Sequence, residues 1–263
     1  MKKYLVIGNP IDHSLSPKIH NYWIEKNNIN AVYNKQKLDE SDLKDLIFKI
    51  KKKEINGINV TVPFKKKIIP FLDSLSPEAN ETQSVNTVYL KNNNIVGHNT
   101  DIDGFKLAIK NLKFDITDKK VFILGAGGVV SSIIYALNKM KVSEIMISNR
   151  TKSKAENLNQ LFKNLVVLEW GELPKFDIII NATSIGLNKD DKFNLDFTKV
   201  GKNKFFYDVI YNPKETNFLK VGKKLGNITE NGKLMFIYQA IAAFKIWHGI
   251  KPVINNETIE LLN

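Results

Sequence analysis

The chain has 263 residues and a mass of 30.0 kDa, which is long enough for two domains. Hydrophobic residues make up 43% of it, so it can bury a core. It has no cysteine, which excludes disulfides and thiolate chemistry, and four histidines leave little material for a metal site. No apolar run approaches the ~18 residues that a membrane span needs, so we expect a cytoplasmic protein with no membrane partner.

The net charge is +12, but its composition argues against nucleic acid as a partner. Of the 39 basic residues, 38 are lysines and only Arg150 is an arginine. Nucleic-acid binders use arginine for forked contacts to bases and phosphates. We therefore expect a small anionic ligand rather than a nucleic acid.

Strand-like runs alternate with helical patterns in the first part of the chain. Strands are predicted at residues 4–7, 31–35 and 57–62, and a helix is predicted over residues 41–51. Another helix is expected to have Ser16 as its N-cap and Pro17 at its first position. Residues 85–90 and 95–98, joined by three asparagines, predict a hairpin.

A second series of strands follows a predicted helix over residues 102–112. These strands are expected at residues 120–124, 144–148, 166–168, 177–181 and 205–208. The apolar helical run over residues 234–247 has no strand after it, so we expect it to pack back on the first half. The pattern predicts an α/β fold with largely parallel sheets in two domains.

A glycine cluster lies between the strand at residues 120–124 and the helical pattern after it. It reads Gly125-Ala126-Gly127-Gly128, and such a turn lets backbone N–H groups approach a pyrophosphate. Val130 replaces the third glycine of the fingerprint, at a position that mainly sets helix–strand packing. The cluster indicates a dinucleotide site, and a tight turn without a ligand is the alternative.

The end of the next predicted strand favours NADP over NAD. A cofactor that lacks the 2′-phosphate usually meets an acidic residue at this point. Here Asn149, Arg150 and Thr151 follow the strand, with Lys154 close behind. Cations and a hydroxyl suit a phosphate dianion, and a helix cap at Thr151 with solvated charges is the alternative.

Three polar stretches in the first part are hard to explain by packing. Capping explains Ser16 but not Ser14. Asn59 and Thr61 alternate with valines, so both are expected on one face of their strand, and Lys65 stands just past its end. The third stretch is Ser84-Val85-Asn86-Thr87, together with Asn99-Thr100-Asp101 after the hairpin.

Hydroxyl and amide side chains of this kind suit a ligand with several hydroxyl groups. Lys65 and Asp101 are the cation and the carboxylate among them, which makes them the candidate acid/base pair. The four histidines are alternatives as the base, although the sequence shows no carboxylate that orients them: His13, His20, His98 and His248.

Nine motifs occur in the order of one known family. They are Gly8-Asn9-Pro10 through Ser14-Leu15-Ser16-Pro17 with His20-Asn21, Asn59-Val60-Thr61-Val62-Pro63-Phe64-Lys65, Val85-Asn86-Thr87, Asn99-Thr100-Asp101 with Gly104, Gly125-Ala126-Gly127-Gly128, Asn149-Arg150-Thr151, Asn181-Ala182-Thr183-Ser184 with Gly186, Asp208-Val209-Ile210-Tyr211-Asn212-Pro213, and Gln239-Ala240. With them the whole chain closely resembles bacterial, NADP-dependent shikimate dehydrogenases. That family reduces 3-dehydroshikimate to shikimate with NADPH, towards chorismate and the aromatic amino acids.

The resemblance implies a domain division and a role for each group of residues. Residues 1–100 and 236–263 would bind the substrate, and residues 101–235 would form a Rossmann-like NADP domain. The catalytic pair would be Lys65 and Asp101. The substrate would contact Ser14 and Ser16 through its carboxylate, Thr61, Asn86 and Gln239 through its hydroxyls, and also Asn59 and Tyr211. The cofactor would contact Gly125, Ala126, Gly127, Gly128, Asn149, Arg150, Thr151, Lys154, Thr183, Ile210, Gly232 and Met235.

The chain departs from the family pattern at a few positions. Val129 and Val130 are bulkier than the usual residues after the glycine cluster, and Leu234 replaces a glycine near the expected nicotinamide position. Two other functions stay open: a quinate/shikimate dehydrogenase that uses NAD, and a regulator that senses NADP without catalysis. The expected partner is a small-molecule substrate, and a homodimer is left open.

Overall fold

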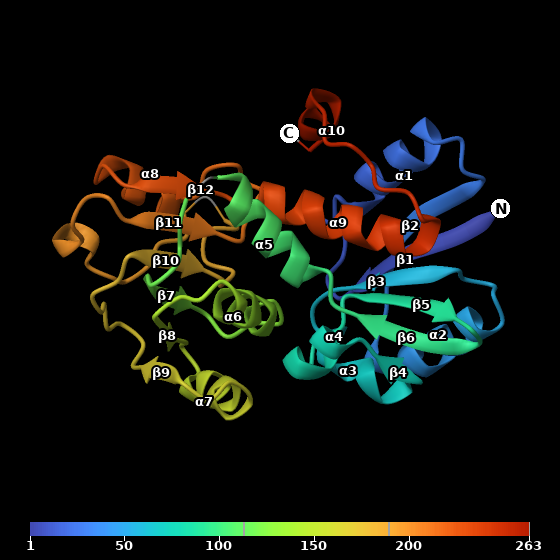
Figure 1. Cartoon of the computed structure of the whole chain (residues 1–263), viewed down its shortest axis with the longest axis horizontal. Coiled ribbons are helices and arrows are strands. Elements are labelled where there is room, and N and C mark those ends of the chain that lie inside the picture. The colour runs from blue at the N-terminus through green and yellow to red at the C-terminus, as the bar shows by residue number, and fades with distance from the viewer. Residues whose placement is uncertain (113, 189, 263) are drawn as a thin grey trace. The chain divides into compact units, whose positions relative to one another are not determined.

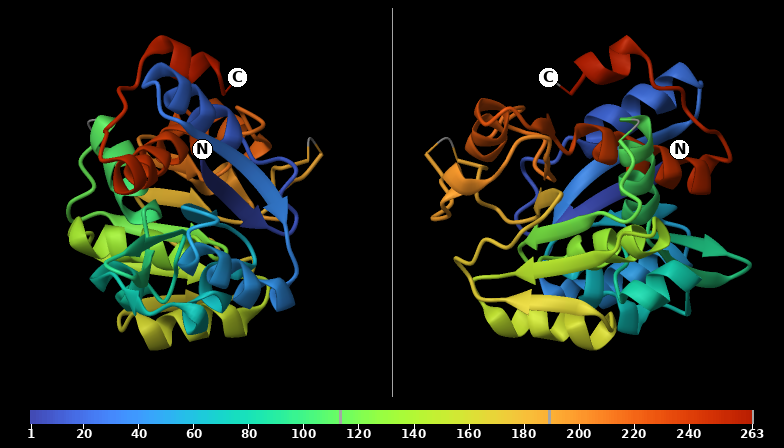
Figure 2. Two further views of the ribbon diagram at one scale, coloured as in Figure 1. Left: turned by 90° about the vertical axis from the view of Figure 1, so that its right-hand side faces the viewer. Right: turned by 60° about the vertical axis from the view of Figure 1, so that its left-hand side comes forward.

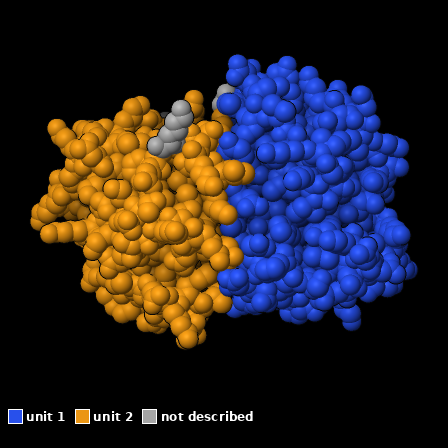
Figure 3. All heavy atoms as spheres, in the orientation of Figure 1, with its two compact units in different colours: residues 1–104, 237–263 blue, residues 105–236 orange. Residues whose placement is uncertain are grey.

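The computed structural model describes residues 1–112, 114–188 and 190–262, which form two compact units (Figures 1 and 3). Unit 1 contains Met1–Gly104 and Ile237–Asn263, and unit 2 contains Phe105–Phe236. The chain passes from one unit to the other within the helices α5 (Asp101–Asn111) and α9 (Lys233–His248). Each unit contains one six-stranded sheet with helices, so the predicted α/β class is confirmed.

Unit 1 is built on a mixed sheet in the order β2-β1-β3-β5-β6-β4. Its strands are β1 (Lys2–Gly8), β2 (Ala31–Lys37), β3 (Gly57–Val60), β4 (Ser74–Leu75), β5 (Thr87–Lys91) and β6 (Asn94–His98). β1 is parallel to β2 and β3, whereas β5 is antiparallel to both β3 and β6. In the β5–β6 turn, Asn92 and Asn93 have positive φ angles of 48° and 64°, as a tight hairpin requires.

Different helices cover the two faces of this sheet. On one face, α2 (Leu43–Lys51) buries the leucines and isoleucines of a core that β3 and β5 share. On the other face, α1 (Ser16–Lys26) and α9 enclose an aromatic cluster: Tyr4, His20, Trp23, Tyr33, Phe244, Trp247 and His248. Trp247 lies so close to Gly57 that a Cβ there would approach the indole Nε1 to 2.4 Å. The predicted return of the C-terminal helix to the first half is therefore confirmed.

The remaining helices of unit 1 are short. They are α3 (Phe64–Lys67), α4 (Pro77–Thr82), α10 (Asn256–Glu260) and the 3₁₀ turns Glu40–Asp42 and Ile69–Phe71. Figure 2 shows the red α10 beside the blue α1, where Tyr22 Oη donates to Glu257 Oε2 at 2.5 Å.

Unit 2 has an all-parallel sheet in the order β12-β11-β10-β7-β8-β9. Its strands are β7 (Lys120–Leu124), β8 (Glu144–Ser148), β9 (Leu165–Leu168), β10 (Ile178–Asn181), β11 (Phe205–Asp208) and β12 (Ile228–Glu230), and its helices are α6 (Val130–Lys139), α7 (Lys152–Leu161), α8 (Asn217–Lys224) and the 3₁₀ turn Phe197–Lys199. This is the doubly wound order 3-2-1-4-5-6, whose strand order reverses between β7 and β10. In such sheets, ligands bind outside the carboxyl ends of the strands near that point.

Two local predictions need correction. Ser16 is not the N-cap of α1: Leu15 holds that position in a helical conformation, and Ser16 begins the helix itself. β3 ends at Val60, so Thr61 lies just past the strand instead of within it. The short strands β4 and β12 were not predicted, because two or three residues carry no periodic pattern. Among the described residues, no helix is long and apolar enough to cross a membrane.

Candidate active site

Lys65 and Asp101 form an ion pair in unit 1. Lys65 lies in α3 just past β3, and Asp101 is the first residue of α5. Lys65 Nζ is 2.5 Å from Asp101 Oδ2, and the two side chains are only 12% and 9% exposed. The two residues predicted as the acid/base pair are therefore in direct contact. Both side chains are largely buried, and Lys65 is slightly more exposed than Asp101.

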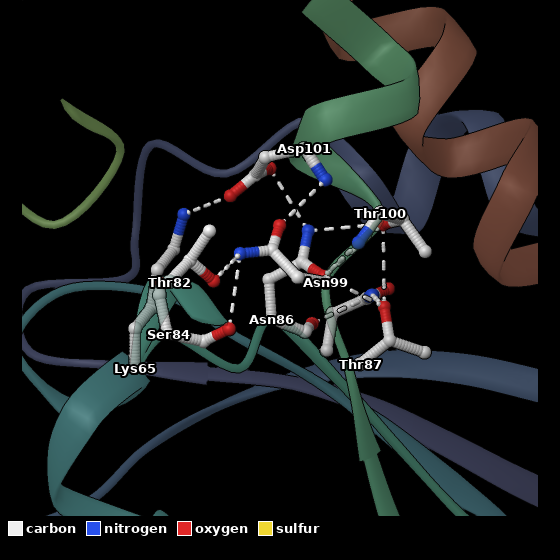
Figure 4. Close-up of polar contacts among 9 residues, drawn as sticks. Lys65, Thr82, Ser84, Asn86, Thr87, Asn99, Thr100 and Asp101 are labelled. Carbon is white, nitrogen blue, oxygen red and sulfur yellow. Dashed lines mark hydrogen bonds and ion pairs between the residues drawn. The ribbon is translucent and has the colours of Figure 1, made fainter. Parts of the chain in front are cut away.

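A network of amides and hydroxyls holds the Asp101 carboxylate (Figure 4). Asn86 Nδ2 donates to Asp101 Oδ1 at 2.8 Å and to Thr100 Oγ1 at 3.0 Å, and Asn86 Oδ1 accepts the Thr100 backbone N–H at 2.8 Å. Asn99 Oδ1 accepts the Asp101 N–H, and its amide nitrogen reaches Thr82 Oγ1 and the Ser84 carbonyl. Each polar group is buried with partners, as a rigid network requires.

The other expected substrate residues of unit 1 differ in their burial and in the hydrogen bonds that they already make. Ser14 is half-buried, and its Oγ accepts the Ser16 N–H at 3.3 Å. Thr61 is half-buried beside Gly8. Gln239 is half-buried in α9. Asn59 is engaged inside the sheet, where its amide nitrogen donates to the Asn86 carbonyl and to Thr87 Oγ1, both at 3.0 Å.

The histidines have different surroundings. His20 is fully buried in the aromatic cluster, neither ring nitrogen has a hydrogen-bond partner among the described residues, and burial lowers its pKa to about 3. His248, in the same cluster, has its pKa lowered to about 4, also by burial. Burial lowers the pKa of His98 as well, and His13 is exposed. His20 and His248 thus belong to a packed aromatic core rather than to the network around Asp101.

In unit 2, the glycine cluster forms the turn between β7 and α6. Gly125 has a φ of +105°, and a Cβ there would approach the Ala182 carbonyl oxygen to 2.7 Å, so only glycine fits. Ala126 N–H donates to Asn149 Oδ1, and Asn149 Nδ2 donates to the Thr151 carbonyl. The Asn149 amide therefore joins the glycine turn to the loop after β8.

The loop after β8 carries the expected phosphate-binding cations. Arg150, Thr151 and Lys154 are exposed, and Thr151 is the N-cap of α7 without a side-chain cap. Lys152 is instead paired with the Glu169 carboxylate. The exposed guanidinium and ammonium groups at this strand end suit a phosphate dianion.

The loops after β10 and β11 are joined through a buried carboxylate. Asp208 accepts hydrogen bonds from Asn181 Nδ2, from the Ile210 N–H and from Thr216 Oγ1. Burial raises the Asp208 pKa to about 6, although these hydrogen bonds act in the opposite direction. Thr183 Oγ1 donates to Asn181 Oδ1, so the same cluster fixes the orientation of the Thr183 side chain. This cluster was not predicted, because its members come from separate segments of the sequence.

The start of α9 lies against the loop after β11. Gly232 N–H donates to the Ile210 carbonyl at 3.1 Å, and a Cβ on Gly232 would meet the Val209 carbonyl oxygen at 2.1 Å. Tyr211 stacks on Phe236 with ring centroids 4.7 Å apart, and Met235 is buried. The expected cofactor residues of unit 2 thus follow β7, β8, β10, β11 and β12, at the carboxyl edge of one sheet.

Comparison with known proteins identifies the family. Residues 6–88 match the shikimate dehydrogenase substrate-binding domain, and residues 106–213 match the shikimate/quinate 5-dehydrogenase domain. A shikimate dehydrogenase (NADP(+)) of Pelagibacter ubique is 60% identical over 262 residues, which cover 100% of this chain and 99% of that one. The chain belongs to the shikimate dehydrogenase family.

Solved structures of shikimate dehydrogenases have the same fold. The enzyme of Aquifex aeolicus aligns with a TM-score of 0.91 and 38% identity, covering 100% of this chain and 97% of that one. The enzyme of Thermus thermophilus, solved with NADP(H) and shikimate, aligns with a TM-score of 0.89 and 28% identity, covering 100% and 98%. The membership predicted from the motifs is confirmed.

The departures from the family pattern have a clear structural setting. Val130 is fully buried as the first residue of α6, where it packs the helix on the sheet as expected of this position. Leu234 is half-buried in the first turn of α9, next to Gly232. The described residues contain no group of three or more His, Cys, Asp or Glu side chains that could hold a metal ion.

Proposed function

We propose that this shikimate dehydrogenase family member interconverts 3-dehydroshikimate and shikimate with NADP(H). The shielded Lys65–Asp101 ion pair within its amide and hydroxyl network carries the proposal. Reducing a ketone to an alcohol requires a proton as well as a hydride, and this pair contains a positioned proton donor.

Lys65 is proposed as the general acid in the reducing direction. Its ammonium group would donate a proton to the carbonyl oxygen of 3-dehydroshikimate, and in the oxidising direction the neutral amine would take the hydroxyl proton back. The contact with Asp101 Oδ2 holds the Lys65 Nζ in place, and Asn86 occupies the other carboxylate oxygen. Asp101 would orient Lys65 and balance its charge.

The residues of unit 2 fit NADP(H). The Gly125 turn has no room for a side chain, so its backbone can be approached closely by a pyrophosphate. Arg150 and Lys154 would hold the 2′-phosphate, and Asn149 replaces the acidic residue that would repel it. Bound NADPH supplies the hydride. Thr183, Ile210, Gly232 and Met235 would hold the nicotinamide half.

The polar residues of unit 1 are proposed to bind the substrate. Ser14 and Ser16 would donate hydrogen bonds to its carboxylate, while Thr61 and Gln239 would bind its hydroxyl groups together with Asn86. Tyr211 of unit 2 would also contact it. Asn59 is proposed to support these residues from within the sheet, because both of its amide hydrogens are already donated there, to the Asn86 carbonyl and to Thr87 Oγ1.

Initial rates of shikimate oxidation would test the function. Purified protein would be assayed with NADP or NAD crossed with shikimate or quinate, following reduced nicotinamide by its absorbance. We expect turnover with NADP and shikimate. A preference for NAD or quinate would instead support the quinate/shikimate dehydrogenase, and NADP binding without any turnover would support the regulator.

Location and assembly can be tested separately. We place the reaction in the cytoplasm, because an NADP-dependent reduction draws on the internal nicotinamide pool. Fractionation of cells that express the chain would test this. Light scattering on the purified protein would separate a monomer of 30.0 kDa from the homodimer that the sequence analysis leaves open.

A further inference from the structure

Asp208, the last residue of β11, joins three segments of unit 2 at the carboxyl edge of its sheet. The residue is fully buried. Its Oδ1 accepts hydrogen bonds from Asn181 Nδ2 and from the Ile210 N–H, both at 3.0 Å, and its Oδ2 accepts one from Thr216 Oγ1 at 2.6 Å. These three donors are neutral. Because burying a carboxyl group among neutral partners costs free energy, packing alone does not explain an aspartate here.

One of these hydrogen bonds leads to Thr183, in the loop after β10. Asn181 Oδ1 accepts the Thr183 backbone N–H at 3.0 Å and the Thr183 hydroxyl at 2.8 Å. Asn181 Nδ2 donates to the Ile185 carbonyl at 2.9 Å as well as to Asp208. A backbone N–H can only donate and a backbone carbonyl can only accept, so the Asn181 amide has one possible orientation. Asp208 thus helps to fix the Asn181 amide, and this amide fixes the Thr183 side chain.

The Thr183 side chain lies beside the glycine turn. A Cβ on Gly125 would approach Thr183 Cγ2 to 2.9 Å and the Ala182 carbonyl oxygen to 2.7 Å. The path from Asp208 through Asn181 therefore ends next to the turn that is proposed to receive the pyrophosphate.

A second hydrogen bond of Asp208 leads to the loops after β11 and β12. The Ile210 N–H donates to Asp208, and the Ile210 carbonyl accepts the Gly232 N–H at 3.1 Å. Gly186, in the loop after β10, packs on the same residues, since a Cβ on it would approach Thr216 Cγ2 to 3.1 Å and Ile210 Cδ1 to 3.3 Å. The loops after three neighbouring strands are thus connected around one carboxyl group.

We propose that Asp208 is a positioning residue for the nicotinamide half of NADP(H): it holds Ile210 directly and Thr183 through Asn181. This inference rests on the proposed function, which assigns Thr183 and Ile210 to that half of the cofactor. Asp208 is buried behind these residues and acts through them. Its hydrogen-bond partners in the described structure do not include the residues after β8 that are proposed to hold the 2′-phosphate. The adenosine half should therefore bind independently of Asp208.

Calorimetric titration with two nucleotides tests this division. NADP carries the nicotinamide, whereas adenosine 2′,5′-bisphosphate keeps the adenosine with its 2′-phosphate and lacks the nicotinamide. In Asp208→Ala, the Asn181 amide and the Ile210 N–H lose the acceptor that they share. We expect the Kd for NADP to rise about tenfold. The Kd for the bisphosphate should stay within about twofold of the wild-type value. An unchanged Kd for NADP, or an equal loss for both nucleotides, would overturn the proposal.

Asp208→Asn is the conservative variant. Its Oδ1 can still accept from Asn181 and from the Ile210 N–H, and its new amide nitrogen can donate to Thr216 Oγ1. We expect this variant to bind NADP within about twofold of the wild-type Kd. A loss as large as that in Asp208→Ala would mean that the negative charge matters rather than the shared oxygen, and it would contradict a positioning role.

Asp177→Ala is the matched control. Asp177 directly precedes β10, at the amino edge of the same sheet, and accepts hydrogen bonds from the Lys120 N–H at 3.0 Å and from Lys204 Nζ at 3.2 Å. Both aspartates therefore join neighbouring strands, but they do so at opposite ends of them. We expect Asp177→Ala to bind both nucleotides as the wild type does. Weaker binding of NADP alone in this control would show that the effect is not specific to Asp208.

Asn181→Ala tests the same link if Asp208→Ala does not fold. This variant removes the path from Asp208 to Thr183 and leaves the hydrogen bond between Asp208 and the Ile210 N–H. We again expect the Kd for NADP to rise about tenfold and the Kd for the bisphosphate to stay within about twofold. Wild-type affinity for NADP in Asn181→Ala would refute the path through Asn181.

The same titrations separate this proposal from the proposed function. A wild-type chain that binds NADP but does not oxidise shikimate would refute the function, and the effect of Asp208→Ala on NADP binding would still be measured. A wild-type chain that binds neither nucleotide would refute both.

Discussion

Asn86 donates a hydrogen bond to Oδ1 of Asp101 at 2.8 Å, and Lys65 Nζ contacts the other oxygen of the same carboxylate. Asn86 is itself fixed from three sides, by Thr87, the Thr100 hydroxyl and the Thr100 backbone N–H. The orientation of the acid/base pair is therefore set by a neutral amide. Lysine and aspartate alone, on flexible side chains, would not have one fixed geometry.

Lys65→Ala should abolish most of the activity. Loss of a positioned general acid is expected to lower kcat about 10²- to 10⁴-fold, while shikimate still binds. Steady-state kinetics and calorimetric titration would measure the two effects. Lys66→Ala is the matched control, because Lys66 is the next residue of α3 and is exposed. Equal losses in the two variants would show that charge, rather than the Lys65–Asp101 contact, matters.

Arg150→Ala should weaken the preference for NADP. Hydrogen bonds to charged groups are worth more than neutral ones, so the ratio of kcat/KM for NADP to that for NAD should fall about 10- to 100-fold. Lys152→Ala provides the comparison, because Lys152 lies two residues away at the start of α7 but is paired with Glu169. An unchanged ratio in Arg150→Ala would exclude a 2′-phosphate contact at this position.

Asp208 should make the folded state less stable as the pH rises from about 4 to 6. Burial raises its pKa from 3.8 to about 6, so over this range the folded protein holds a proton that the unfolded chain has released. The contribution of the protonated group is complete below pH 3.8 and is lost by pH 6, a change of ~3 kcal/mol. Urea unfolding at several pH values should show this slope, and Asp208→Asn should lack it. A slope that persists in the variant would assign it to other groups.

His20 should act in the opposite direction. Its pKa is lowered from 6.5 to about 3, chiefly by burial, so the unfolded chain takes up a proton first as the pH falls. The folded state should lose ~1.4 kcal/mol for each pH unit below 6.5 on account of this group. His20→Phe keeps an aromatic ring but cannot take up a proton. In this variant the free energy of unfolding should therefore fall less steeply with decreasing pH, by the contribution of one proton. Urea unfolding at several pH values would measure this, and an unchanged slope in His20→Phe would assign the loss to other groups.

The two sites differ in how far the sequence predicts them. The glycine turn after β7 and the cations after β8 are contiguous motifs, so their position follows once the strands are recognised. Lys65 and Asp101 are 36 positions apart in the chain. Their pairing was predicted from the acid/base chemistry of a cation and a carboxylate, because the hydrophobic periodicity of the sequence says nothing about such a contact. The contact of Tyr33 with Asn59 was not predicted, because a tyrosine in a strand usually indicates packing alone.

Short elements and caps explain the local errors. Ser16-Pro17 has the composition of a helix start, but the Ser16 N–H donates to Ser14 Oγ, and Leu15 precedes the helix without a side-chain cap. β3 stops at Val60 because the chain turns before Pro63, and the Phe64 N–H then bonds to the Thr61 carbonyl. In both places a local turn takes precedence over the propensity that the composition suggests.

The contact of Trp247 with Gly57 has a consequence for biosynthesis. The aromatic face of the unit 1 sheet is covered by residues that the ribosome adds after unit 2, whereas unit 2 is one continuous segment, Phe105–Phe236. Residues 1–104 therefore cannot complete this core until unit 2 has been synthesised. Unit 2 can close its own sheet earlier, so the nascent chain matures from its middle outward, against the usual N-terminal-first order.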